Sequence, residues 1–296
     1  MEDRLSFETK HNFTRKKENK FTLFFKRNWG QLLILLSLIV LAILVLYPLF
    51  ILLIRSFKSP DLDNADPFGF PTVVTFENYM VIWPLLKNAY LNSFVTTISV
   101  TVGTVLLSSM LAYAFIRFNF PGKKIIYYLI ISLMMIPGIL TLITRFQMVV
   151  SMGLINTYSG VILPGIAGYI PSSFVLLFVF FTGLPKDLFE AAEIDGASDF
   201  KTYTHIVAPL STPILWTIGI QTFVGEWNDY LWAKLILNGE TWKTLPVYLT
   251  EINYQTAGSW TVPFAGYILS SLPLVFLFIA AGKQFISGMT SGAVKM

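Results

Sequence analysis

Four carboxylates lie close together in the stretch EAAEIDGASDF, residues 190–200: Glu190, Glu193, Asp195 and Asp199. The residues around them are mostly small, and small side chains let another backbone come close. Exposed carboxylates also accept charge-assisted hydrogen bonds from the arginines of a partner protein. The stretch therefore predicts a docking surface. A solvated amphipathic loop with its charges facing water is the alternative, and composition alone favours it.

A second group of polar and aromatic residues forms the stretch EWNDY: Glu226, Trp227, Asn228, Asp229 and Tyr230. Carboxylates and amides hydrogen-bond to sugar hydroxyls, and aromatic rings pack on the apolar faces of sugar rings. The group is therefore a candidate substrate contact. An interfacial aromatic belt with charges at the level of the lipid headgroups is an equal alternative.

Polar side chains inside apolar segments provide further candidates for a substrate path, because polar groups in hydrocarbon usually face a cavity. Asn92 and Gln221 are two such residues. Close helix packing is the alternative for polar residues of this kind.

The sequence contains no arrangement typical of a catalytic centre. Cysteine is absent, and the two histidines, His11 and His205, are too far apart to form a metal cluster. A P-loop of the form G-x-x-x-x-G-K-[ST] does not occur, so the chain is not an ATPase by that route. G-x-S-x-G and H-E-x-x-H motifs are missing as well. We therefore expect a protein that is not an enzyme and holds no cofactor of its own.

The elements that position these residues are helices in a membrane. Hydrophobic residues make up 54% of the chain, charged residues make up 13%, and the mean hydropathy is +0.64, which indicates a polytopic membrane protein. About 20 apolar residues cross a hydrocarbon core of about 30 Å as a helix. Six segments of this kind predict an all-α fold with six transmembrane helices: residues 30–54, 89–116, 125–143, 159–181, 212–233 and 261–282.

Basic residues indicate the orientation of these spans. With a cytoplasmic N-terminus, 15 lysines and arginines fall on the cytoplasmic side and 6 on the outer side. This distribution predicts a cytoplasmic N-terminal tail, 1–28, whose basic residues lie along anionic membrane lipids, a transmembrane domain over 29–282, and a cytoplasmic C-terminal tail, 283–296.

The acidic stretch then falls in a cytoplasmic loop, 184–210, for which local signals predict a helix, a turn and a second helix. Pro185 suits the first turn of a helix, and Asp187 is favourable at its positive end. Gly196 can end this helix in a left-handed conformation. Ser198 can begin the second helix, which must yield at Pro209.

The whole pattern EAAEIDGASDFKTYTHIVAPLSTP resembles the EAA loop in the permeases of bacterial ABC importers. The stretches TFENY (75–79), FPGKK (120–124), EWNDYLWA (226–233) and SGAVKM (291–296) are similar to the carbohydrate-importer permeases of the maltose type, the MalG-like family. One departure is Ala208-Pro209, where the family often has Leu-Pro.

The resemblance implies the type I ABC importer permease fold in a bacterial inner or plasma membrane. It also implies the partners: a second homologous permease, two ATPase subunits that hold ATP and magnesium, an extracytoplasmic solute-binding protein that meets the loop 234–260, and a sugar, with no nucleic acid. Glu190 would form a salt bridge with the ATPase, and four residues would shape the docking surface: Ala191, Ala192, Asp195 and Gly196. A permease for a non-sugar solute and a secondary transporter are the alternative functions.

Overall fold

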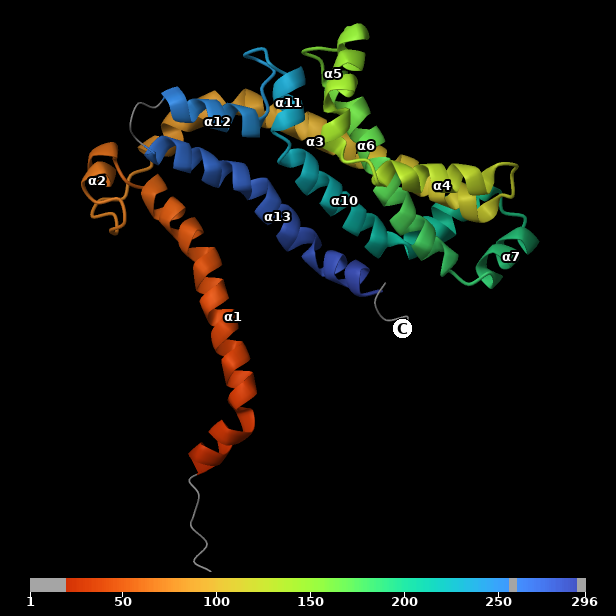
Figure 1. Ribbon diagram of the computed structural model, residues 1–296, viewed down its shortest axis with the longest axis horizontal. Coiled ribbons are helices and arrows are strands. Elements are labelled where there is room, and N and C mark those ends of the chain that lie inside the picture. Colours follow the sequence, from red (N-terminus) through yellow and green to blue (C-terminus); the bar gives the residue numbers. More distant parts are fainter. Residues whose placement is uncertain (1–19, 256–259, 292–296) are drawn as a thin grey trace, which may run out of the picture. The chain divides into compact units, whose positions relative to one another are not determined.

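The computed structural model describes residues 20–255 and 260–291, and in this part of the chain the regular structure is helical, without strands. The predictions for residues 1–19 and 292–296 lie outside it. The chain divides into two units, Met1–Ile51 and Leu52–Met296, which are treated separately. Helix α1, Lys20–Ser56, makes up the described part of the first unit and continues into the second (Figure 1).

The second unit is a helical bundle built around α3, Glu77–Arg117. This helix packs against α6 (Tyr158–Thr182), α10 (Thr212–Trp227) and α13 (Thr261–Ser291). The α3–α6 crossing is close at Gly103, where an added Cβ would lie 2.4 Å from the side-chain tip of Ile166. A side chain at this position would therefore force Ile166 to move aside.

Four of the six predicted spans are confirmed as continuous helices that are long and apolar enough to cross a membrane: Trp29–Ser56, Glu77–Arg117, Tyr158–Thr182 and Thr261–Lys283. Helix α3 begins at Glu77, which is 12 residues before residue 89, the start of the predicted span. The other two spans are bent pairs, so the described residues provide up to six spans when each pair is counted as one.

The prediction of one helix over 125–143 is wrong. Helix α4, Lys123–Met134, ends before Pro137, and the chain resumes as Gly138–Ser151, which includes α5, Leu142–Ser151, at an angle of 95°. Proline disfavours a helical conformation of the preceding residue and cannot donate a helical hydrogen bond, so the helix stops there. The fifth span was also predicted too long, because α10 ends at Trp227 and a separate helix, α11, covers Leu231–Ile236.

One end of the bundle, which we call the α7 end, carries the predicted helix–turn–helix. Helix α7 covers Asp187–Ile194 and α8 covers Asp199–Thr202; a π-helical turn, Tyr203–Val207, then leads to α9, Ala208–Leu210. As predicted, Gly196 has a left-handed conformation (φ +69°). Its N–H donates to the Glu193 carbonyl and the Ala197 N–H donates to the Ala192 carbonyl, which closes the C-terminus of α7.

The other end, which we call the α12 end, contains α2 (Pro60–Ala65), α12 (Leu245–Gln255), the first turns of α3 and the loop 237–244. Separate apolar clusters stabilise the two ends. Phe174, Leu177 and Phe181 are central to the cluster at the α7 end, and Ile82, Leu86 and Leu249 to that at the α12 end. Helix α3 contributes to both clusters and so connects them.

Candidate coupling surface and substrate path

The predicted docking residues lie on and just after α7, and most of them are accessible. Glu190, Ala191, Asp195 and Gly196 are exposed. Ala192 is the exception, since it is only 4% exposed. Ala192 is therefore not accessible for direct contact with a partner in this conformation, and its role in shaping the docking surface stays a prediction.

The acidic stretch is less free for a partner than its sequence suggests. Arg117, the last residue of α3, pairs with two of the four carboxylates, those of Glu193 and Asp199. The distance from Arg117 Nε to Asp199 Oδ1 is 2.6 Å. Glu190 and Asp195 form no ion pair within the described residues, so these two carboxylates remain available to another chain.

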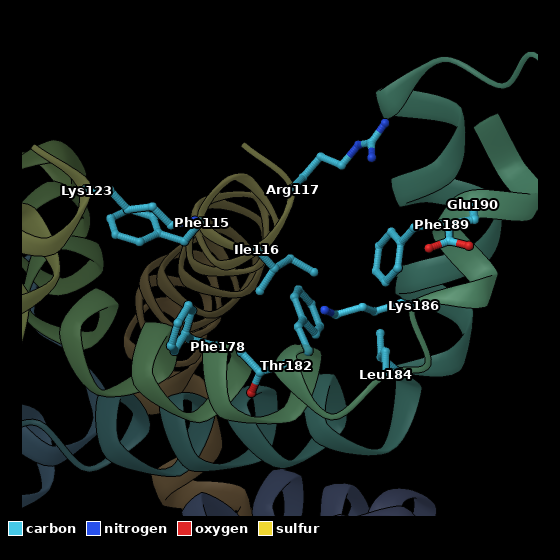
Figure 2. A pocket seen from close by; sticks show the side chains of 11 residues that line it. Phe115, Ile116, Arg117, Lys123, Phe178, Thr182, Leu184, Lys186, Phe189 and Glu190 are labelled. Atoms are coloured by element: carbon cyan, nitrogen blue, oxygen red, sulfur yellow. The ribbon is translucent and has the colours of Figure 1, made fainter. Parts of the chain in front are cut away.

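A hollow of about 520 Å³ separates α7 from the ends of α3 and α6 (Figure 2). Its walls are mainly apolar and include Phe115, Phe178 and Phe189. Figure 2 shows the side chain of Lys186 extending across this hollow from the α7 side, whereas the carboxylate of Glu190 lies at its edge. Helix α7 is therefore incompletely packed against the helices behind it.

Asn92 was predicted to line a substrate path, but the structure gives it another role. Its side chain is 3% exposed, and its amide donates 2.9 Å hydrogen bonds to the carbonyls of Thr241 and Lys243. Its Oδ1 accepts a 2.7 Å hydrogen bond from the hydroxyl of Tyr158. Asn92 thus fastens the loop 237–244 to α3 and α6, with both ends of its amide occupied.

Other side chains fasten the same loop. Ser93 accepts a hydrogen bond from the N–H of Leu245, and the Oδ1 of Asn156 accepts two from the N–H groups of residues 238 and 239. Lys243 pairs with Glu240 and Glu251 at 2.7 Å each. Burial lowers the pKa of Lys243, but these hydrogen bonds and charges outweigh it and the pKa lies above the usual value. The ammonium group therefore stays charged at neutral pH.

Trp227 was also predicted to contact substrate, and it is instead a core residue. Its side chain is 2% exposed, and its ring stacks on Phe223 at a centroid distance of 5.6 Å and meets Phe94 edge-on at 4.9 Å. Its indole N–H donates to the carbonyl of Ser270, which joins α10 to α13. No face of this ring is open to a sugar in this conformation.

Glu226 belongs to a group of titratable side chains that the sequence did not reveal. Its side chain is 7% exposed and lies within electrostatic range of Asp229 and of Arg145 on α5. The guanidinium of Arg145 lies 4.0 Å from the ring centroid of Trp232. Tyr169 on α6 lies within electrostatic range of both carboxylates. Arg145 is a single charged residue in an apolar stretch and is far from Glu226 in the sequence. No local sequence pattern therefore indicates that the two side chains are close.

Gln221 and Asn228 differ from the buried residues around them because both are exposed on or next to α10. Asn228 donates a 2.7 Å hydrogen bond to the carbonyl of Val224, which leaves its Oδ1 free to accept one. The prediction that Gln221, Asn228 and Glu226 line a substrate path therefore stays a prediction.

The fold and these surfaces define a class of protein: a multi-pass α-helical membrane protein with an accessible acidic helix–turn–helix at one end. Residues 104–291 match the family of the binding-protein-dependent transport system inner membrane component. The chain belongs to this family, as its motifs predicted; it is a permease of an ABC transport system, a translocation subunit and not an enzyme.

Individual relatives cover nearly the whole chain. It is 34% identical over 273 residues to the trehalose/maltose transport system permease protein MalG of Thermococcus litoralis, covering 90% of this chain and 97% of that one. It is 31% identical over 273 residues to the arabinooligosaccharides transport system permease protein AraQ of Bacillus subtilis, with coverages of 88% and 94%. A crystal structure of a bacterial ABC transporter involved in the import of the acidic polysaccharide alginate has a similar chain, with a TM-score of 0.77, 23% identity and coverages of 88% and 97%. This last likeness supports the fold.

Proposed function

We propose that this chain is a membrane subunit of an ATP-driven importer of oligosaccharides and forms half of the translocation path. Family membership supports the importer, and the named substrates of the relatives, trehalose, maltose and arabinooligosaccharides, support the substrate class. The family description also names a binding protein, which supports an extracytoplasmic solute-binding protein as a partner. A second homologous permease would complete the path.

The observation that carries the coupling role is the accessible carboxylate of Glu190 on α7. A free carboxylate on an exposed helix is suited to a charge-assisted pair with an arginine of an ATPase subunit. The ATPase pair would hold ATP and magnesium, because this sequence contains no P-loop. In this arrangement the α7 end and both chain termini face the cytoplasm, and the α12 end meets the binding protein.

Transport then follows from a difference in stability between two arrangements of the bundle. ATP binding closes the ATPase pair and carries α7 with it, so the path opens outward; hydrolysis returns the path to the inward state. The nucleotide can shift this equilibrium only as far as it stabilises one arrangement more than the other. We propose that the contact at Glu190 transmits this difference in stability from the ATPase pair to the bundle.

Two substitutions of Glu190 test the coupling role in the complete complex. Glu190→Ala and Glu190→Lys are expected to reduce copurification of the ATPase subunits and sugar uptake, with normal membrane insertion. Asp61→Ala is the control, because Asp61 is an exposed carboxylate on α2 at the α12 end. Unchanged copurification and unchanged uptake in the Glu190→Lys complex would contradict the proposal.

The substrate class needs a separate measurement. The complex is reconstituted with its binding protein, and ATP hydrolysis is measured with oligosaccharides, amino acids and peptides in turn. Stimulation by an oligosaccharide supports the proposal, and stimulation only by an amino acid or peptide would favour an importer for another solute. Accumulation of solute against a gradient without nucleotide would favour a secondary transporter.

A further inference from the structure

Arg117 joins α3 to both helices of the helix–turn–helix. Its Nε lies 2.6 Å from Asp199 Oδ1 at the start of α8, and its Nη2 pairs with Glu193 near the end of α7. The planar guanidinium can satisfy two carboxylates at once in a fixed geometry. One side chain therefore fixes the positions of α7 and α8 relative to each other and to α3.

The chain segments that connect α7 and α8 to the bundle are not continuous straight helices. Residues 183–186 between α6 and α7 are not part of a helix, and the segment Asp199–Leu210 is bent by 78° from Thr212–Trp227. The hollow behind α7 also leaves it space to move relative to Phe115 and Phe178. Leu184 and Phe189 do pack on the nearby apolar cluster, but such contacts are not directional.

Polar contacts to α3 provide directional links in addition to this apolar packing. Beyond the two ion pairs of Arg117, the hydroxyl of Tyr203 in the π-helical turn lies 2.6 Å from the hydroxyl of Ser109, two turns earlier on α3. The side chains that orient the helix–turn–helix thus converge on α3, although α3 is not its neighbour in sequence.

Helix α3 also reaches the α12 end, where Asn92 and Ser93 hold the loop 237–244 and the first residue of α12. It is one unbroken helix of 41 residues, with Pro84 near its beginning as its internal proline. A displacement of its C-terminal end can therefore be carried as a rigid body to the loop at the other end.

We infer that Arg117 is the positioning residue that couples the helix–turn–helix to α3 and, through α3, to the loop 237–244. This inference rests on the proposed function, since the displacement that Arg117 passes on originates in the ATPase. It differs from the role of Glu190: Glu190 binds the motor, whereas Arg117 passes on the movement after the motor is bound.

The experiment compares Arg117→Gln with Lys124→Gln in the complete complex. Lys124 is an exposed basic residue in the first turn of α4 that pairs with no carboxylate among the described residues. Arg117→Gln is expected to keep the ATPase subunits and basal ATP hydrolysis but to lower uptake and stimulation by the loaded binding protein about tenfold. Lys124→Gln is expected to leave ATPase copurification, basal ATP hydrolysis, uptake and stimulation by the binding protein near wild type.

Movement at the distant loop provides the readout that a purely structural role would not change. Because this chain has no cysteine, a single Asn238→Cys substitution gives it one labelling site, at the exposed loop tip, and labelling is measured on this subunit after it is separated from the others. ATP is expected to change the labelling rate in the parent complex and not in the Arg117→Gln complex. An ATP response of equal size in both complexes would overturn the inference.

The remaining outcomes separate this inference from the proposed function. Loss of the ATPase subunits from the Arg117→Gln complex would show that Arg117 serves docking, and it would also overturn the inference. Failure of the Glu190 experiment instead contradicts the proposed function. If the Arg117→Gln variant does not accumulate in the membrane, uptake is measured in the double variant Arg117→Asp/Asp199→Arg, which exchanges the two charges. Restored uptake would support the coupling role, and absent uptake would contradict it.

Discussion

The hydroxyl of Tyr158 lies 2.7 Å from Oδ1 of Asn92, although 66 residues separate them in the sequence. The same asparagine donates to two carbonyls of a loop about 150 residues further on. One buried amide therefore joins α3, the start of α6 and the loop 237–244. A residue that looks like a sugar ligand in the sequence is a fastening point for the α12 end.

Asn92→Asp tests this role with little change in shape. The substitution removes both N–H donors and places a carboxylate against the carbonyl oxygens of Thr241 and Lys243. We expect a loss of about 1–3 kcal/mol in stability and faster hydrogen exchange in residues 237–244, measured by thermal unfolding and exchange mass spectrometry. Asn238→Asp at the exposed loop tip is the control and should change neither. A raised KM for sugar with unchanged thermal stability would instead place Asn92 in the substrate path.

Trp227 provides a similar contrast between core and substrate contact. Trp227→Ala is expected to cost about 3–5 kcal/mol, because it empties a site enclosed by Phe94, Phe223 and α13. Trp216 on the same helix is 45% exposed, and Trp216→Ala should cost less than about 1 kcal/mol. Chemical denaturation of the two variants measures the difference. If Trp227→Phe weakened sugar binding without loss of stability, Trp227 would be a substrate contact after all.

Arg145 is expected to stabilise the carboxyl groups of Glu226 and Asp229. Arg145→Leu removes the positive charge and should cost about 1–3 kcal/mol, less than the loss of one partner from a contact ion pair. Glu226→Gln should recover part of this loss in the double variant, because the acidic group that Arg145 stabilises is then absent. A double-mutant cycle on unfolding measures this coupling. Additive effects of the two substitutions would show that the electrostatic interaction contributes nothing.

Arg145→Lys is the matched control for that cycle. It keeps the positive charge but loses the flat contact of the guanidinium with the ring of Trp232. The stability of this variant should lie between those of the parent and Arg145→Leu. The difference between the two variants then separates the contribution of charge from that of ring packing.

The sequence predicts features whose physical cause is local. Long apolar runs predict the spans, because a helix must satisfy its own backbone in hydrocarbon. Gly196 and Ser198 were predicted at the turn after α7, because left-handed glycines and serine caps act within a few residues of their own position. The bend of 95° after Met134 was missed, since Pro137 indicates a break without fixing its angle.

The roles of single polar residues were harder to predict because their partners are distant in sequence. Arg117 finds Asp199 across 82 residues, and Asn92 finds Lys243 across 151. An asparagine that lines a path and one that fastens a loop have the same side chain and the same apolar neighbours. Only the folded arrangement shows which of its donors and acceptors are already used.

Gly196 provides the last prediction, because its left-handed backbone sets the turn between α7 and α8. Gly196→Ala should cost about 1–2 kcal/mol, since a Cβ is disfavoured at φ +69° even though nothing lies within 4 Å of it. Gly196→Asn should cost less, because asparagine tolerates this conformation better. Gly168→Ala is the control: it is an open helical position in α6 without a positive φ, and alanine there should be neutral or stabilising. Hydrogen exchange in residues 187–202 should rise in Gly196→Ala alone, and equal protection in all three variants would show that the turn does not depend on the left-handed residue.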